Sequence, residues 1–392
     1  MHNYKKIRKV HLTFRALPVS NDPSLNESTP GPSTANPEVP GSIKIVETDF
    51  CEPAGRTLLE MIQHPNDATK SLLLVWKNGQ VRFAEKVKIG DQVFLPLPRN
   101  AAITRHLRLA NGIESLESAK NLILQIVHFL SSTVELSTLE LVVVSCFVVC
   151  TWLIEKLPFA PYVAFVGPPG SGKTTALRVL NLLCRRGLLT SDISPSAFYE
   201  ICDRMTPTVL IDETATVDNR RKLFHVLRTG TSHDFVAFRK NRTFKLYGAR
   251  AVSWLIPPND EALNSRCLLI TMASCKRTNL LPPNDARVLR VAESLQRKLL
   301  HFRLANFQTL TLPKLGDEEQ LQPRTRDLFR ALSMSLGDDE ETQRLLFFSS
   351  RAKNRSESYF LLIRLLFWNR STTSSIFFQN SIMSGWRLWL KV

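Results

Sequence analysis

The sequence predicts an α/β fold in which helices flank a mainly parallel sheet. Strand-like and helix-like segments alternate over residues 161–275, which is typical of parallel strands joined by helical crossovers. An apolar run at 162–166 leads through a glycine-rich loop into a helical segment. A second apolar run, 208–211, ends in two adjacent carboxylates, which indicates a buried parallel strand with acids at its carboxyl edge.

The regions around this core differ from it in composition. Residues 42–110 hold short β-branched and aromatic runs separated by turn signals, which predicts a small β-rich module without an evident catalytic site. Helical spacing predicts a lead-in before the core and a lid or C-terminal domain after it. The segments that we expect are a basic arm and disordered linker (1–41), the β-rich module (42–110), the helical lead-in (111–160), the α/β core (161–275), the helical lid (276–340) and a basic aromatic tail whose pattern does not decide whether it folds (341–392).

Local signals predict individual elements. Ser194 as an N-cap, followed by Pro195 at the first helical position, predicts a helix over 194–205. The other elements that we expect from apolar spacing and turn signals are strands over 71–76, 80–89 and 92–97 and helices over 114–132 and 284–306.

The charge of the chain favours a polyanionic partner. Its 392 residues include 51 Lys or Arg against 35 Asp or Glu, a formal net charge of +16. Such a charge attracts nucleic acid over long range, and counterion release adds to the affinity. The alternative is a set of basic residues scattered over a solvated surface, which charge by itself does not exclude.

The apolar residues and cysteines fit a cytoplasmic protein. The seven cysteines form no CxxC pair and no cluster with histidines at metal-ligand spacing, so we expect reduced core thiols. The N-terminus lacks the pattern of a secretion signal. The apolar run 141–153 is shorter than the roughly 18–20 residues that span a bilayer. We expect no membrane association and interpret this run as a buried helix packed against the α/β core.

The glycine-rich loop has the sequence of a nucleotide-binding P-loop. It matches G-x-x-x-x-G-K-T between a strand and a helix, which is the context that this motif requires. Backbone N–H groups and the helix N-terminus would surround the β-phosphate of ATP, Lys173 would reach the β- and γ-phosphates, and the Thr174 hydroxyl would ligate Mg²⁺. We therefore predict ATP and Mg²⁺ as cofactors. The predicted nucleotide-binding residues are Gly167, Pro168, Pro169, Gly170, Ser171, Gly172, Lys173, Thr174, Thr175 and Asp212.

Two carboxylates complete the predicted catalytic site. Asp212 and Glu213 follow the second apolar run, at the sheet edge where the phosphates would lie. We predict that Asp212, together with Thr174, holds Mg²⁺ and that Glu213 polarises the attacking water. The alternative is a strand that simply ends in solvated acids.

These motifs give the chain a family resemblance. GPPGSGKT, a short gap, an apolar strand ending in Asp-Glu and a later Ser-Arg resemble the superfamily 3 helicases, which belong to the wider AAA+ class. The chain also resembles uncharacterised bacterial ATPases found with phage and plasmid primase-helicases, over about residues 113–310. The P-loop and the acidic strand are shared by many ATPases that are not helicases, so the resemblance implies ATPase activity more directly than unwinding.

A basic hairpin is implied by the same resemblance. DFVAFRK (234–240) and TFKLYGAR (243–250) predict two strands with a basic tip. Superfamily 3 enzymes place a hairpin at this point that projects into a central pore and grips the nucleic-acid backbone. By that resemblance Arg239, Lys240, Arg242 and also Lys245 would contact phosphates. The alternative is an exposed turn with ordinary surface charges.

The resemblance also suggests residues that sense the γ-phosphate. Asn259, after the apolar strand 251–256, would orient the attacking water, and Arg266 would reach the γ-phosphate bound by a neighbouring subunit of a ring. Pro257 and Pro258 before the asparagine depart from the family pattern, so Ser253 is the other candidate for the first role. A plain surface salt bridge is the alternative for Arg266. Arg287 and Arg290 are candidates for a second sensor.

Three readings of the whole chain follow. The first is an ATPase stimulated by nucleic acid, with single-stranded DNA favoured, that acts as a ring-forming helicase or translocase. The second is an ATP-dependent switch that regulates a protein partner without unwinding. The third is a degraded remnant of a mobile element that binds ATP but does not assemble. The sequence does not distinguish DNA from RNA and does not give the number of subunits.

Overall fold

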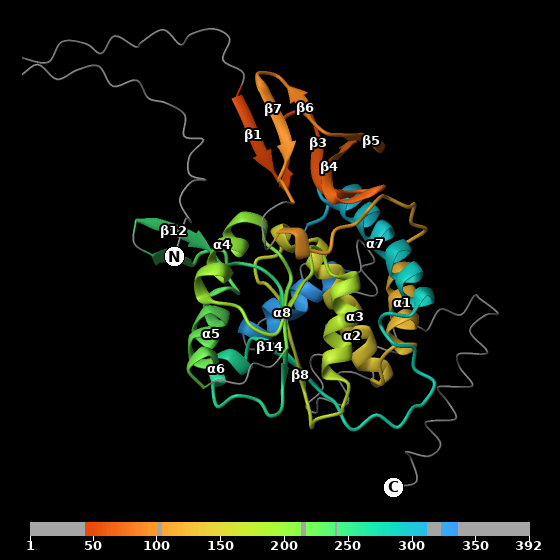
Figure 1. The fold of residues 1–392 in the computed structure, drawn as a ribbon, viewed down its shortest axis with the longest axis vertical. Helices are drawn as coiled ribbons and strands as arrows, with labels where there is room; N and C mark the ends of the chain where they lie inside the picture. The colour runs from red at the N-terminus through yellow and green to blue at the C-terminus, as the bar shows by residue number, and fades with distance from the viewer. Residues whose placement is uncertain (1–43, 100–103, 213–216, 240, 312–322, 336–392) are drawn as a thin grey trace, which may run out of the picture. The chain divides into compact units, whose positions relative to one another are not determined.

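The computed structural model gives the fold of most of the chain (Figure 1). The predicted basic arm and linker, 1–41, and the predicted tail, 341–392, lie outside the residues that it describes. All described residues belong to one compact unit. They are 44–99, 104–212, 217–239, 241–311 and 323–335.

A five-stranded parallel sheet forms the centre of the unit. Its strands stand in the order β14, β8, β13, β10, β9, and every neighbouring pair is parallel. The predicted parallel sheet is therefore confirmed. β13 separates the strand before the glycine-rich loop, β8, from the acidic strand, β10, so β13 also contributes to the edge where both end. The bounds are β8 Tyr162–Val166, β9 Leu188–Thr190, β10 Val209–Ile211, β13 Arg250–Trp254 and β14 Cys267–Thr271.

Helices cover the sheet because its strands are apolar on both faces. All residues of β8 and β13 are buried, as expected for central parallel strands. In Figure 1, α1, α2, α3 and α7 lie to one side of the label of β8, and α4, α5 and α6 lie to the other. The helices are α1 Ala119–Ser131, α2 Thr138–Trp152, α3 Lys173–Leu183, α4 Pro195–Met205, α5 Val217–Thr229, α6 Glu261–Asn264, α7 Ala286–Asn306 and α8 Pro323–Met334, with short 3₁₀ turns η1 Thr104–His106 and η2 Ile154–Lys156.

Capping residues decide where several helices begin. Ser194 accepts a hydrogen bond from the Ala197 N–H at 3.3 Å, and α4 begins at Pro195 as predicted. The helix predicted over 114–132 instead begins at Ala119, because Ser118 caps it by accepting from the Asn121 N–H at 3.1 Å.

Residues 141–152 of the apolar segment lie within α2, and Leu153 is the C-cap of this helix. This helix is buried almost throughout, and the Trp152 indole N–H donates to the Leu183 carbonyl of α3 at 2.9 Å. The prediction of a buried helix against the α/β core is confirmed. Among the described residues, every helix falls short of the length or the hydropathy that a membrane span requires.

The β-rich module consists of two sheets. The four-stranded sheet has the order β2, β3, β4, β5, and the three-stranded sheet has the order β1, β7, β6. The single strand predicted over 80–89 is wrong, because the chain leaves one sheet after Ala84 and joins the other at Val87. The bounds are β1 Lys44–Thr48, β2 Phe50–Cys51, β3 Thr57–His64, β4 Asp67–Lys77, β5 Gln80–Ala84, β6 Val87–Ile89 and β7 Gln92–Pro96.

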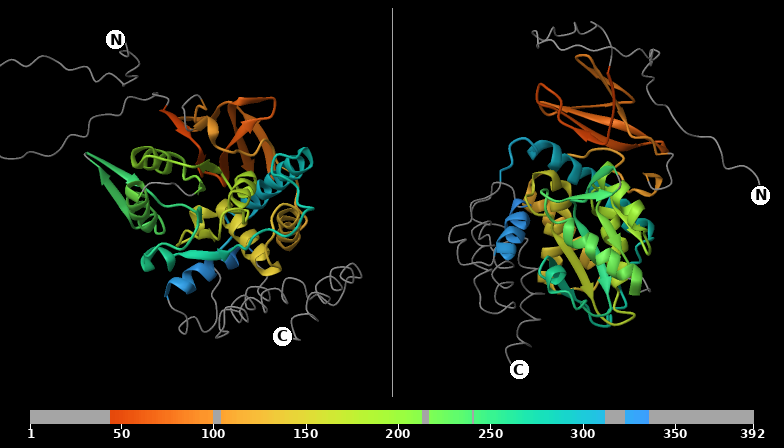
Figure 2. Two further views of the ribbon diagram at one scale, coloured as in Figure 1. Left: turned by 60° about the horizontal axis from the view of Figure 1, so that its bottom comes forward. Right: turned by 90° about the vertical axis from the view of Figure 1, so that its left-hand side faces the viewer.

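A buried ionic network joins this module to the α/β core, and Figure 2 shows the module against α7 from two further sides. Glu60 of β3 is 2% exposed, and its carboxylate accepts hydrogen bonds from Arg185, Arg186 and Arg303 at 2.8–3.0 Å. Burial by itself raises the pKa of the Glu60 carboxyl, but the three guanidinium groups outweigh it and hold this pKa below its ordinary value.

Two further carboxylates balance the positive charge of the three arginines in this network. Glu155 accepts from Arg185 at 2.7 Å and from Arg303 at 2.8 and 3.1 Å, and Asp49 pairs with Arg186. Three carboxylates thus face three guanidinium groups, which satisfies the requirement that buried charges be paired. Arg185 and Arg186 follow the last turn of α3, whose first residue is Lys173 of the glycine-rich loop. One helix therefore connects the loop with the module.

The cysteines differ in their exposure. Cys146, Cys150, Cys184 and Cys202 are buried free thiols, as expected, and burial raises the pKa of Cys146 to about 11. Cys275 is exposed, so the prediction of core thiols is wrong for this residue.

Candidate nucleotide site

The glycine-rich loop connects β8 to α3 in a conformation that needs its glycines. Gly170 and Gly172 have φ of 77° and 89°, in the left-handed region that side chains disfavour. Gly167 is held by close packing, since a Cβ there would lie 2.1 Å from the Met272 carbonyl oxygen. The Gly167 N–H also donates to the Trp254 carbonyl of β13 at 3.1 Å. The loop is therefore held by contacts to β13 and to the residue that follows β14, the two segments on either side of β8, and this arrangement is consistent with an α/β P-loop fold.

Lys173 extends over this loop. Its ammonium group donates to the carbonyl oxygens of Gly167 at 2.6 Å and Pro168 at 2.8 Å. Gly172, the N-cap of α3, has no side chain that would cap the first turn, so N–H groups of that turn are available to an anion. The ammonium group and the helix N-terminus thus both bring positive charge to the loop.

The acidic strand meets the loop through hydrogen bonds. The Thr174 hydroxyl donates to Asp212 Oδ2 at 2.8 Å, and the Ser253 hydroxyl of β13 donates to Asp212 Oδ1 at 2.6 Å. The Asp212 N–H donates to the Thr190 carbonyl at 2.9 Å, which fixes the backbone of the aspartate. The predicted pair Thr174 and Asp212 is therefore together in space, and Ser253 joins it because β13 lies between the two motif strands.

The chemistry of these groups suits a magnesium ion. The Asp212 carboxylate and the Thr174 hydroxyl are hard oxygen donors, and Mg²⁺ is typically held by one or two protein oxygens together with phosphate oxygens and water. No cluster of three or more His, Cys, Asp or Glu side chains with metal-ligand geometry occurs among the described residues. The Asp212 and Thr174 oxygens are of the kind that would hold Mg²⁺.

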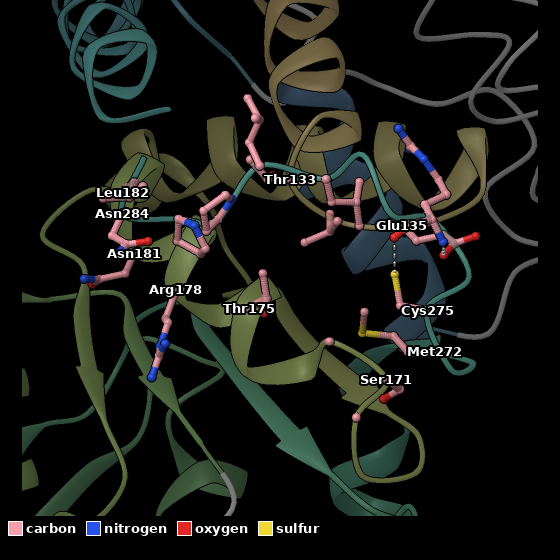
Figure 3. A pocket seen from close by; sticks show the side chains of 18 of the residues that line it. Thr133, Glu135, Ser171, Thr175, Arg178, Asn181, Leu182, Met272, Cys275 and Asn284 are labelled. Atoms are coloured by element: carbon pink, nitrogen blue, oxygen red, sulfur yellow. Dashed lines mark hydrogen bonds between the residues drawn. The ribbon is translucent and has the colours of Figure 1, made fainter. Parts of the chain in front are cut away.

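A cavity of about 760 Å³ lies beside the loop (Figure 3). Gly170, Ser171, Gly172 and Thr175 line one side, and in Figure 3 the Thr175 side chain points into the open space. Residues of α3 form a further part of the lining, and two walls come from segments far away in the sequence: Thr133 to Glu135, between α1 and α2, and the strap that connects β14 to α7. We did not predict these wall residues, since nothing in the sequence links the 133–135 turn to the loop.

Hydrogen bonds hold the strap against the α1–α2 turn. Glu135 Oε2 accepts from the backbone N–H groups of Lys276 at 2.7 Å and Arg277 at 3.1 Å. The Arg277 guanidinium donates to the Ser131 carbonyl at 2.9 Å, and the Leu281 N–H donates to the Ser132 carbonyl at 2.9 Å. The bonds to Glu135 also lower the pKa of its carboxyl group, those of Arg277 first. The wall of the cavity is thus tied down at several points.

Arg266 lies at the opposite end of the sheet. It immediately precedes β14, which pairs in parallel with β8 so that Cys267 is beside Tyr162 and Thr271 is beside Val166. At about 3.3 Å per residue, Arg266 is about 16 Å from the loop edge along the strand. Its Nε donates to the Thr231 hydroxyl at 3.4 Å, and burial, followed by the charge of Arg324, lowers its pKa. Arg266 therefore does not serve the loop of its own chain.

The remaining predicted residues of the nucleotide site are Asn259, Glu213, Arg287 and Arg290. Asn259 is exposed, in the bend after β13. Glu213, the predicted general base, lies outside the described residues. Arg287 pairs with Asp285, the N-cap of α7, at 2.8 Å, and Arg290 lines a separate groove between α1 and α7. No contact brings Arg287 or Arg290 to the loop within the described part of the chain.

The predicted hairpin is present. β11 Val236–Arg239 and β12 Arg242–Lys245 pair in antiparallel fashion, with Arg239 opposite Arg242. Arg239, Arg242 and Lys245 are exposed, and Lys240 lies outside the described residues. The second strand ends at Lys245 instead of continuing to 250: residues 246–249 form a buried connection, and Arg250 is already the first residue of β13.

Comparison with known proteins gives distant structural likenesses. No protein-family model matches the chain, and no curated protein matches it. The A form apo structure of the NrS-1 C-terminal region is similar with 12% identity over 81% of this chain and 90% of that chain, at a TM-score of 0.31. The same region over 305–718 gives 15% identity, 62% and 65% coverage and a TM-score of 0.29. The X-ray structure of JCV helicase gives 16% identity, 59% and 64% coverage and a TM-score of 0.29. The chain thus spans just under two thirds of the last two, and the fold assignment depends on its own strand order and loop.

Proposed function

We propose that this protein is a magnesium-dependent ATPase. The observation that carries the proposal is the convergence of the glycine-rich loop with the acidic strand, where the Thr174 hydroxyl lies 2.8 Å from Asp212 Oδ2. These two motifs are 38 residues apart in sequence and belong to strands that are not neighbours in the sheet. Their meeting at the carboxyl edge, beside a loop that exposes N–H groups and an ammonium group, supports a triphosphate as the ligand.

Each group has a proposed task in hydrolysis. Loop N–H groups and Lys173 bind the phosphates, and the adenosine occupies the cavity beside Thr175. Thr174 and Asp212 hold Mg²⁺, which when bound neutralises charge on the phosphate oxygens. Ser253 orients Asp212 through its 2.6 Å hydrogen bond. Glu213, the residue after Asp212, polarises the attacking water.

Nucleic acid is the proposed activator, with single-stranded DNA favoured. The formal charge of +16 and the exposed cations of the hairpin support this part of the proposal. Assembly into a ring is proposed because Arg266 is remote from the loop of its own chain. A neighbouring copy would receive this arginine at its γ-phosphate, as helicases and translocases of this kind do. Asn259 remains a second candidate for orienting water.

The test is ATP hydrolysis by the full chain with and without single-stranded DNA, over a series of salt concentrations. We expect Lys173→Ala to abolish ATP binding, and Glu213→Gln to abolish turnover while ATP remains bound. Stimulation by DNA should fall steeply as salt rises, because it depends on phosphate contacts. Turnover that ignores nucleic acid but rises with a protein partner would support the switch reading instead. Absence of magnesium-dependent ATP binding would refute the whole proposal.

A further inference from the structure

The two faces of the β11–β12 hairpin differ in what they contact. Strand alternation places Ala237 and Arg239 on one face, opposite Phe244 and Arg242. This inner face packs on α4: the Arg239 guanidinium donates to the Tyr199 hydroxyl at 2.7 Å and lies 4.9 Å from the centre of the Tyr199 ring. The inner arginines are therefore partly engaged by the protein itself.

The outer face carries an aromatic side chain that contacts little. Phe238 is 69% exposed and Val236 is 41% exposed, and the residues opposite them on β12 are Thr243 and Lys245. Phe235, just before the strand, is 58% exposed. Figure 1 shows the hairpin standing out beside α4. An aromatic side chain so exposed, next to an exposed lysine, loses the free energy that burial would provide unless a ligand covers it.

We propose that Phe238 stacks on an unpaired base of single-stranded nucleic acid, while Lys245 on the same face of the hairpin contacts an adjacent phosphate. This inference rests on the proposed activation by nucleic acid and names the residue that recognises the strand. Aromatic platforms flanked by positive charge are the usual means of binding single strands without reading their sequence. Residues 235–246 of the hairpin carry four Lys or Arg and no acid in the sequence, and Asp203 of α4 accepts a hydrogen bond from the Lys245 backbone N–H at 2.9 Å. Charge complementarity therefore favours a polyanion over an apolar protein surface.

Base stacking and phosphate contact predict different dependences of the binding affinity on salt concentration. Loss of one stacked base weakens binding by about 5-fold to about 150-fold, and it leaves the salt dependence unchanged because no counterion is released. Loss of one phosphate contact reduces the slope of log K against log salt by roughly 0.7 for a single strand. Phe238→Ala and Lys245→Ala should therefore be distinguishable in one salt titration.

The experiment measures fluorescence anisotropy of a labelled oligothymidylate and of an abasic strand of the same length, each with the full chain. Phe238→Ala should weaken binding of the oligothymidylate by at least about 5-fold, leave the abasic strand unaffected, and keep the salt slope. Phe238→Trp keeps an aromatic ring at this position and should bind the oligothymidylate about as tightly as the wild type. The matched control is Phe83→Ala, because Phe83 is also exposed, at 47%, and lies on β5 of the β-rich module, away from the hairpin in sequence. The unfolding midpoint of both variants should match that of the wild type, because neither side chain is buried.

Specific results would overturn the inference. Equal weakening of the oligothymidylate and the abasic strand, or no weakening of either, would show that Phe238 stacks on no base. A change of sedimentation coefficient in Phe238→Ala, with DNA affinity retained, would assign the outer face to a protein contact. If the wild type binds neither strand, the proposed activation by nucleic acid is refuted, and the stacking role of Phe238 is refuted with it.

Discussion

Replacing Glu60 with glutamine should strongly destabilise the protein. The Glu60 carboxylate, 2% exposed, accepts hydrogen bonds from Arg185, Arg186 and Arg303. Glutamine has nearly the same size but only one acceptor oxygen, and its NH₂ group would face guanidinium donors. The substitution therefore removes a buried negative charge and leaves three guanidinium groups beside two carboxylates.

The burial of Glu60 determines how much the free energy of unfolding should fall in Glu60→Gln. Removing one partner of a buried ion pair costs about 3–5 kcal/mol, because the remaining charge stays desolvated without compensation. We expect Glu60→Gln to lower the free energy of unfolding by that amount. Glu85, in the same module, is exposed, so Glu85→Gln should change the free energy by less than about 0.5 kcal/mol.

The free energy of unfolding should depend on pH differently in the wild type and in Glu60→Gln. The pKa of Glu60 in the folded state lies below its value of about 4.3 in the unfolded chain. The ionised carboxylate therefore stabilises the fold fully above about pH 4.3, and this contribution is lost as the pH falls through the lowered folded pKa. Glu60→Gln has no such group, so its stability should fall less steeply over the same acidic range.

Urea unfolding followed by circular dichroism measures both effects. A wild-type midpoint in Glu60→Gln at neutral pH would refute the reasoning, since it would mean that the three arginines need no carboxylate at this position. Equal losses in Glu60→Gln and Glu85→Gln would do the same. If the module alone unfolds early in the variant, two transitions should replace one, which would locate the network as the joint between module and core.

Further substitutions test the candidate site. Ser253→Ala removes the 2.6 Å hydrogen bond to Asp212, so ATP turnover should fall by roughly 10-fold while ATP affinity changes little, in steady-state and binding assays. Gly167→Ala would place a Cβ 2.1 Å from a backbone carbonyl oxygen, so calorimetry should detect little ATP binding, whereas Gly90→Ala, with no atom within 4 Å of its Cβ, should bind ATP normally. Arg266→Ala should keep ATP binding but lose hydrolysis, and mixing it with a variant that cannot bind ATP should restore some turnover if the arginine acts between subunits.

The sequence determined the elements whose signals are local. The P-loop motif, the N-cap at Ser194 and the buried strand 162–166 each depend on residues within a few positions of one another. Apolar composition on both faces predicted a parallel sheet and the burial of α2, and the structure agrees. Errors occurred where local pattern was ambiguous, as at 80–89, where one apolar alternation belongs to two sheets.

Strand order and long-range contacts were decided only by the tertiary structure. Ser253 joins Asp212 because β13 lies between β8 and β10, and no local pattern encodes which strand occupies that position. The arginine partners of Glu60 lie 125, 126 and 243 residues away, so a single glutamate in a strand gave no sign of an ionic network. Hairpin residues could be named from sequence, but which of them face α4 and which face outward depends on packing. Local chemistry thus fixes elements, while the burial of their faces against one another fixes the site.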